Sequence, residues 1–223
     1  MTPEELHHSR DPALLRKEQE RTLASVRLKY GLLARLLFLF MDLLYRSRSL
    51  SKFKVLEVIA RVPYQAWEHV AYIAMTHTYT RPHFAGRIFE FLKEARQQQD
   101  NEQWHLLILE EIVQKKKIRE SFFLHRILPQ GMAFFYYHVS WLLYVMKPAW
   151  SYRLNAEFED HAEHEYALFV QQHPELETER FESDFQAEYG PIQTCADLFR
   201  RIGLDERVHK EESLARIRQA RFV

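Results

Sequence analysis

Apolar residues recur at helical spacing along most of the chain, and prolines separate the segments in which they do so. The pattern predicts helices at about residues 12–25, 28–46, 51–79, 84–116, 130–146, 149–172 and 194–219. Apolar periodicity resumes after Pro63, so we expect a kink there rather than the end of a helix. Residues 173–193 are the most charged part of the chain and are predicted to be a surface connection. Long helices with few strands indicate a helical bundle.

Two stretches, residues 30–44 and 132–146, are much more apolar than the rest. As helices they would each span roughly 22 Å, short of a hydrocarbon core of about 30 Å. Asp42 and His138 interrupt them, so we do not expect either to cross a membrane. Basic residues follow the first stretch closely, as is typical of helices on an anionic lipid surface: Arg46, Arg48, Lys52 and Lys54. From these features alone, membrane-surface helices and buried core helices are equally open.

Composition narrows the class of protein further. The 223 residues suffice for one domain with a sizeable core, and only 5 of them are glycine, which agrees with a mostly helical chain. Lysine plus arginine and aspartate plus glutamate both number 31, which gives no general argument for a nucleic-acid partner. The single cysteine, Cys195, excludes an internal disulfide. The N-terminus lacks the features of a signal or transit peptide, and His7 and His8 are interpreted as solvated.

Glu-x-x-His pairs place a carboxylate and an imidazole on one helix face, and the chain has four of them. Two lie in the polar N-terminal tail and are interpreted as accidental, Glu4/His7 and Glu5/His8. The other two lie on long predicted helices, Glu102/His105 and Glu206/His209. Ferritin-like di-iron proteins combine two such helices with two further helices that each offer one glutamate. The pattern therefore directs attention to lone glutamates in apolar surroundings.

One lone glutamate is Glu57 in the run KVLEVIARVP, where an isolated carboxylate is costly to bury without a cation or a metal. Glu68 is the rival candidate on spacing alone, and pairing with arginine is the alternative for either residue. The second candidate lies in NAEFEDHAEHEYALF, a run with five acidic residues: Glu157, Glu159, Asp160, Glu163 and Glu165. Spacing does not choose among these five, and such a run is often one charged helix face.

The chain resembles the alternative oxidases, and most of all their plastid terminal oxidase branch, in four ordered motifs: LEVIARVPY, NEQWHLLILEE, FEDHAEHEY and LDERVHK. The apolar segment QGMAFFYYHVSWLLYVMKPAWSYR adds to the resemblance, which covers about residues 30–212. It implies an all-α fold, a ferritin-like four-helix bundle with a di-iron site plus two apolar membrane-surface helices. We expect this single domain at residues 28–220, preceded by a polar N-terminal arm at residues 1–27.

By motif position, the resemblance implies six iron ligands: Glu57, Glu102, His105, Glu159, Glu206 and His209. It implies a redox-active tyrosine at Tyr166, seven residues after Glu159, and a family aspartate at Asp205. The implied quinol contacts are Lys52, Leu56, Ala162 and Glu165. The chain departs from the family at Lys52, where arginine is usual, and in the third motif, which reads Glu-Asp-His-Ala rather than Glu-Glu-Glu-Ala. The choice between plastoquinol and ubiquinol therefore stays open.

The implied activity is that of a membrane-bound quinol oxidase, which reduces dioxygen to water at two non-haem iron ions without pumping protons. Because quinol is a lipid, we expect the two apolar stretches to lie in one leaflet. The protein would be monotopic on the cytoplasmic face of a bacterial inner or thylakoid membrane and would form a homodimer; the missing transit peptide favours a bacterial source. A di-iron quinone-ring hydroxylase and a non-enzymatic helical scaffold are the alternatives, and manganese in place of iron stays open.

Overall fold

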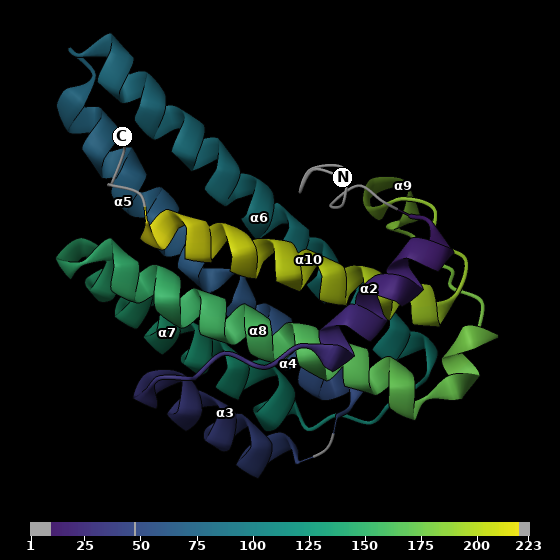
Figure 1. Cartoon of the computed structure of the whole chain (residues 1–223). Helices are drawn as coiled ribbons and strands as arrows, with labels where there is room; N and C mark the ends of the chain where they lie inside the picture. Colours follow the sequence, from purple (N-terminus) through teal and green to yellow (C-terminus); the bar gives the residue numbers. More distant parts are fainter. Residues whose placement is uncertain (1–9, 47, 219–223) are drawn as a thin grey trace.

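The computed structural model describes residues 10–46 and 48–218, which are folded almost entirely into helices (Figure 1). The longer helices are α2 (Pro12–Ala24), α3 (Leu32–Tyr45), α4 (Leu50–Ala60), α5 (Val62–Thr78), α6 (Pro82–Lys115), α7 (Leu128–Met146), α8 (Pro148–Gln172) and α10 (Cys195–Ile217). Short helical turns are the π-helix η1 (Phe123–Ile127), the 3₁₀-helix η2 (Pro174–Glu177) and α9 (Gln186–Tyr189). The described residues contain no strand beyond an isolated bridge between Arg180 and Thr194. The prediction of an all-α fold is confirmed.

Local chemistry explains where the helices begin. Pro82 and Pro148 are the first residues of α6 and α8, positions at which a missing N–H removes no hydrogen bond. The hydroxyl of Thr194 caps α10 by accepting a hydrogen bond from the N–H of Asp197 at 3.1 Å. Ser49 caps α4 in the same way. These starts lie within a few residues of the predicted ones, because capping depends on neighbours in the sequence.

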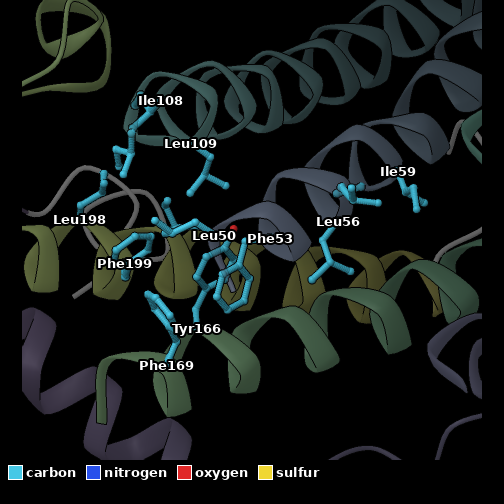
Figure 2. Packing of buried hydrophobic residues seen from close by; sticks show 14 of the residues in the cluster. Leu50, Phe53, Leu56, Ile59, Ile108, Leu109, Tyr166, Phe169, Leu198 and Phe199 are labelled. Carbon is cyan, nitrogen blue, oxygen red and sulfur yellow. The ribbon is translucent and has the colours of Figure 1, made fainter. Parts of the chain in front are cut away.

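Helices α4, α6, α8 and α10 form a four-helix bundle, with α8 packed along α10 and α4 packed against α6. Figure 2 shows the interior near one end of the bundle, where aromatic and aliphatic side chains from all four helices point toward one another. Helix α5 continues the chain from α4 and pairs with α6 in a hairpin that extends beyond the other helices (Figure 1). A second apolar cluster fills the space between this hairpin, α7 and α8.

Two predicted helix boundaries are wrong. The helix expected at residues 51–79 is two helices, because Pro63 has no N–H to donate to the carbonyl of Ile59; α4 ends at Ala60 and α5 begins at Val62. The helix expected from residue 28 begins only at Leu32. The preceding residues lie extended against α8, and their backbone N–H groups bond to its carboxylates instead of continuing a helix.

The charged segment at residues 173–193 does more than connect two helices along the surface. Four of its apolar side chains are buried and join the main core: Leu176, Phe181, Tyr189 and Ile192. The prediction of a surface connection is therefore wrong for these positions. The local sequence pattern favoured a loop because acidic and polar residues outnumber the apolar ones in this segment. The four buried apolar residues are spaced irregularly, so they match neither the period of a helix nor that of a strand.

Part of the predicted polar arm at residues 1–27 is the helix α2, which packs on α8 and α10. His7 and His8, the two Glu-x-x-His pairs of the tail and residues 219–220 of the expected domain lie outside the described residues. Helices α3 and α7 expose many large apolar side chains, among them Leu39, Leu43, Phe134 and Phe135. Within residues 10–46 and 48–218, we find no helix that combines the length and apolar character needed to cross a membrane.

Candidate metal centre

The six predicted ligands lie on the four helices of the bundle and meet in its interior. Glu57 comes from α4 and Glu159 from α8, while α6 contributes Glu102 with His105 and α10 contributes Glu206 with His209. All six side chains are at most 1% exposed. The Glu-x-x-His spacing works as expected, because residues three apart on a helix point to the same side.

Their donor atoms form two overlapping groups. Glu57, His105, Glu102 and Glu206 make up the first, and Glu102, Glu206, Glu159 and His209 make up the second, each with ligand atoms within 4.8 Å of one another. Glu102 and Glu206 belong to both groups. Nδ1 of His209 lies 2.6 Å from Oε1 of Glu102, and Nδ1 of His105 lies 3.3 Å from Oε1 of Glu206. Two neighbouring cations sharing two bridging carboxylates fit this arrangement.

Several oxygens in the cluster accept no hydrogen bond from the part of the chain that the structure describes: Glu57 Oε2, Glu159 Oε2 and both oxygens of Glu102 and Glu206. Buried carboxylate oxygens are normally hydrogen-bonded or paired with a cation, since their burial otherwise costs several kcal/mol, about 2–7 for even a neutral polar group. The donor set of four carboxylates and two imidazoles therefore fits a pair of iron ions.

The pKa values of the cluster also indicate a site that favours bound positive charge. Burial is the main cause that raises the pKa of Glu57 to about 8, and the neighbouring Glu102 carboxylate raises it further. Burial and Glu102 also raise the pKa of Glu159 to about 7. Burial alone would lower the pKa of His209, but the Glu102 carboxylate outweighs it and the pKa rises to about 9. Without metal, the site retains protons to reduce repulsion among its acids.

A second set of residues orients His105. Its Nε2 lies 3.3 Å from Oδ2 of Asp205, which leaves Nδ1 facing the ligand carboxylates. The hydroxyl of Tyr189 donates to the same oxygen of Asp205 at 2.8 Å and lies 3.2 Å from Nε2 of His105. Arg201 forms an ion pair with Asp205. Asp205 was expected from the resemblance, whereas Tyr189 was missed because it lies in the segment interpreted as a surface connection.

Two tyrosines donate hydrogen bonds to the cluster from opposite sides. Tyr166 on α8 donates to Oε1 of Glu57, and its ring stacks on Phe53 with centroids 4.4 Å apart (Figure 2). Tyr64 on α5 donates to Oε1 of Glu159 at 2.7 Å. Tyr64 was not singled out in the sequence. The available signal was its spacing, because it follows Glu57 by seven residues, as Tyr166 follows Glu159.

The four residues expected to contact quinol are all buried, and the two charged ones are paired. Nζ of Lys52 lies 2.5 Å from Oδ1 of Asp42, and Glu165 pairs with arginines 27 and 48. Leu56 and Ala162 are each 2% exposed. Burial lowers the pKa of His161 to about 4; among its charged neighbours, Glu165 raises this pKa and Lys52 lowers it. The His161 ring stacks on Phe38, with ring centroids 3.9 Å apart.

An apolar pocket of about 400 Å³ opens between α3 and α7. Its walls come from both helices and from Leu154 of α8, and they include Leu37, Phe40, Phe135 and Tyr136. None of the four residues expected to contact quinol is among its lining residues. The pocket belongs to the same face of the molecule as the exposed apolar side chains of α3 and α7.

In the acidic run on α8, Glu159 belongs to a group of possible metal ligands, and the other four carboxylates bond or pair with other parts of the chain. Glu163 accepts hydrogen bonds from Thr22 of α2 and from Arg207 of α10, while Asp160 accepts one from the N–H of Leu28. The other two behave alike: Glu157 accepts from the N–H of Gly31, and Glu165 pairs with arginine. Asp160, Glu163 and His164 lie close enough to hold a metal, but Lys210 already pairs with both acids.

The rival glutamate, Glu68, lies on α5 and pairs with Arg96 across the hairpin at 2.6 Å. It is absent from both groups of ligand atoms. The choice of Glu57 over Glu68, which the resemblance implied, therefore agrees with the geometry, since Glu57 is the one that faces α6 and α10. The surroundings of Glu68 match the alternative weighed for it, an arginine partner near the surface.

A four-helix bundle that brings four buried glutamates and two histidines together in this way defines the ferritin-like class of di-metal carboxylate proteins. Comparison with known families makes the assignment more specific. A family model described as alternative oxidase matches residues 17–214, and the chain belongs to that family. The resemblance drawn from its motifs is confirmed.

A relative from Arabidopsis thaliana, "Ubiquinol oxidase 4, chloroplastic/chromoplastic", is 35% identical over 130 residues. The match covers 58% of this chain and 34% of the relative, so the chain spans about a third of that protein's length. The similarity to a plastid member agrees with the branch that the motifs indicated.

Proposed function

We propose that this protein is a quinol oxidase that reduces dioxygen to water at two iron ions. The observation that carries the proposal is the pair of overlapping ligand groups sharing Glu102 and Glu206, whose buried carboxylate oxygens accept no hydrogen bond from the described chain. Iron bound there would supply the reversible electron transfer and open coordination positions that dioxygen reduction requires. Membership of the alternative oxidase family and the relative named as a ubiquinol oxidase support quinol as the electron donor.

The chain's own residues divide the task among them. Glu102 and Glu206 would bridge the two ions, with Glu57 and His105 completing one site and Glu159 and His209 the other. Asp205 and Tyr189 hold the ring of His105 through its Nε2. A histidine fixed in this way presents one nitrogen to a metal with little loss of rotamer freedom on binding.

Tyr166 is proposed to be the redox-active residue of the reaction. Its hydroxyl donates to Oε1 of Glu57, so the phenolic proton has an acceptor next to the metal site. The ring lies between Phe53 and Phe199, and the side chain is fully buried, which excludes water from the phenol. A phenol held in this manner can give one electron and one proton together without a large rearrangement.

Quinol is proposed to bind through Lys52, Leu56, Ala162 and Glu165. The apolar pocket between α3 and α7 supports a site for its tail, since the pocket is lined by aliphatic and aromatic side chains and opens on the exposed apolar face. The same face supports attachment to one leaflet of a bacterial inner or thylakoid membrane on the cytoplasmic side. We propose a homodimer and a single catalytic domain over residues 28–220, with either plastoquinol or ubiquinol as substrate and no proton pumping.

Oxygen uptake by the purified protein with a panel of quinols tests the function. We expect quinol-dependent oxygen consumption, quinone as the organic product, and two irons per chain; metal analysis also decides between iron and manganese. A ring-hydroxylated product would instead identify a di-iron quinone hydroxylase. Protein that binds no metal and consumes no oxygen would indicate a helical scaffold without enzymatic activity.

A further inference from the structure

The two tyrosines at the centre have matching positions in the sequence and matching hydrogen bonds. Each follows a ligand glutamate by seven residues, and each donates its hydroxyl to the glutamate of the other pair: Tyr166 to Glu57 and Tyr64 to Glu159. Asn155 also donates to the hydroxyl of Tyr64, at 3.0 Å, and orients it. By hydrogen bonding alone, both phenols are equally well placed to exchange an electron and a proton with the centre.

Their further surroundings differ. The ring contacts of Tyr166 in the described chain are with Phe53 and Phe199, and benzene rings without a substituent are far harder to oxidise than phenols or indoles. Among residues 10–46 and 48–218, Tyr166 therefore has no tyrosine or tryptophan in ring contact to which an oxidising equivalent could move on. Tyr64 instead packs edge to face against Trp67, with ring centroids 5.2 Å apart.

Trp67 continues the aromatic contact outward. Its ring centroid lies 4.6 Å from that of Tyr152 and 6.1 Å from that of Tyr144, and the hydroxyls of these two tyrosines are 3.3 Å apart. The indole N–H donates to Ser151 at 2.8 Å, which fixes the ring. Tyr152, at the outer end of the series, is 5% exposed, whereas Tyr64 is fully buried. Oxidisable side chains in ring contact thus lead from the carboxylate of Glu159 to Tyr152, which is the most exposed of the series although it is still largely buried.

We propose that Tyr64, Trp67 and Tyr152 form a relay that carries oxidising equivalents away from the centre when dioxygen is reduced without quinol. The inference rests on the proposed function, because dioxygen at the metal site is the oxidant. Full reduction of dioxygen takes four electrons, so an enzyme lacking quinol must draw the missing ones from its own side chains. Such a relay would limit oxidation of the metal ligands and of Tyr166.

Each step balances. With iron held by the ligand groups and dioxygen as the oxidant, Tyr64 would give up one electron while its O–H bond breaks and the proton passes to Oε1 of Glu159. Trp67 gives one electron to the resulting phenoxyl, which takes the proton back, and the oxidised indole keeps its N–H bond to Ser151. Tyr152 then gives an electron to Trp67 and a proton to water. A soluble hydrogen-atom donor, of the thiol or ascorbate class, restores the O–H bond of Tyr152 and is itself oxidised.

The test uses the full chain, loaded with iron(II) under anaerobic conditions and then exposed to dioxygen without quinol. Peptide mass spectrometry locates oxidised side chains, and electron paramagnetic resonance of frozen samples detects tyrosyl and tryptophanyl radicals. Trp67→Phe removes the oxidisable indole but keeps an aromatic ring. Phe91→Leu is the matched control, since it reduces packing in the same apolar cluster and removes no oxidisable group. Tyr152→Phe is a second variant that deletes a single hydroxyl.

In the wild type we expect oxidation at Trp67 and Tyr152. Trp67→Phe should lower oxidation of Tyr152 severalfold and raise oxidation of Tyr64. Tyr152→Phe should still show oxidation at Trp67. The control Phe91→Leu should show the same oxidation as the wild type. Equal oxidation of Tyr152 in the wild type and in Trp67→Phe would overturn the relay. The relay would also be overturned if the wild type took up iron and consumed oxygen while Trp67 and Tyr152 stayed unmodified. Wild-type protein that binds no iron would instead overturn the proposed function, and the relay with it.

Discussion

At the scale of single residues, the shared carboxylates have a different role from the unshared ones. Glu102 and Glu206 belong to both groups of ligand atoms, whereas Glu57 belongs to one. We therefore expect Glu206→Gln to lose both iron ions and Glu57→Gln to retain a fraction of the metal, as measured by iron per purified chain. Glu68→Gln, the same change outside the site, should keep the full complement. Equal iron content in Glu206→Gln and this control would contradict the ligand assignment.

The phenol of Tyr166 gives a second prediction at this scale. Tyr166→Phe keeps the ring that stacks on Phe53 and removes the hydrogen bond to Glu57. If the hydroxyl only positions Glu57, the loss is about 1–1.5 kcal/mol, or on the order of tenfold in rate. A redox role predicts full iron content with turnover almost abolished, which is the outcome that we expect. Iron stoichiometry and quinol oxidase rate in one preparation decide, and a rate within about tenfold of wild type would refute the redox role.

Protonation of the metal-free site gives a third. The pKa of Glu57 is raised to about 8 and that of Glu159 to about 7, mainly by burial, and the pKa of His209 is raised to about 9 by Glu102. Each group holds its proton below its pKa, and metal ligands bind after losing theirs. Affinity for a redox-inert ion such as zinc should therefore rise between about pH 6 and about pH 9, with proton release visible by calorimetry in different buffers. If the zinc affinity did not change with pH and binding released no protons, the metal-free site would not hold these protons.

At the scale of the elements, α8 carries Glu159 of the candidate metal centre and also anchors the N-terminal segment. Glu163 is 1% exposed and lies between Arg207 and Lys210, with Thr22 of α2 as a further donor. Removing the carboxylate takes one acidic partner from each of these two cations, while Arg207 keeps its ion pair with Glu18 and Lys210 keeps its pair with Asp160. Most carboxylates of the acidic run on α8 therefore hold the N-terminal segment against the bundle. Spacing in the sequence alone could not separate them from the candidate metal ligand.

We expect Glu163→Gln to lower the free energy of unfolding by about 1.5–3 kcal/mol, because buried charge-assisted hydrogen bonds are lost while Arg207 and Lys210 each keep a second acidic partner. Denaturant unfolding of the metal-free protein measures the change without interference from metal binding. Glu20→Gln on the exposed side of α2 is the matched control and should change stability by less than about 0.5 kcal/mol. Glu163 contributes to no ligand group of the centre, so iron content in the folded variant should stay at the wild-type level.

At the scale of the whole molecule, the exposed apolar face of α3 and α7 lies beside an apolar pocket, and we propose that it rests on a lipid surface. Burying one large apolar side chain stabilises by about 1.5–3 kcal/mol, so each of Leu39→Glu and Phe134→Glu should weaken vesicle binding on the order of tenfold or more. Phe89→Glu, an exposed position on α6, is the control. Vesicle co-sedimentation measures the effect, and equal losses in all three variants would argue against a defined membrane face.

The amino-acid sequence determined what depends on neighbours within a few residues. The 3.6-residue period and the prolines gave the helices to within a few positions at most ends, and the Glu-x-x-His spacing put Glu102 with His105 and Glu206 with His209 on common faces. The four ordered motifs also indicated the family, which the family model confirms. These features follow from helix geometry, which is the same wherever the helix is packed.

Only the tertiary structure decided which side chains from distant segments meet. Glu159 faces Glu102 and Glu206 while its neighbours on α8 hold the N-terminal segment, a division that depends on how α8 packs against both α10 and α2. Tyr189 reaches Asp205 from a segment that looks like a loop, and Tyr64 reaches Glu159 across the bundle. The physical reason is that such contacts join residues far apart in the chain, and their positions are set by the packing of whole helices rather than by local sequence.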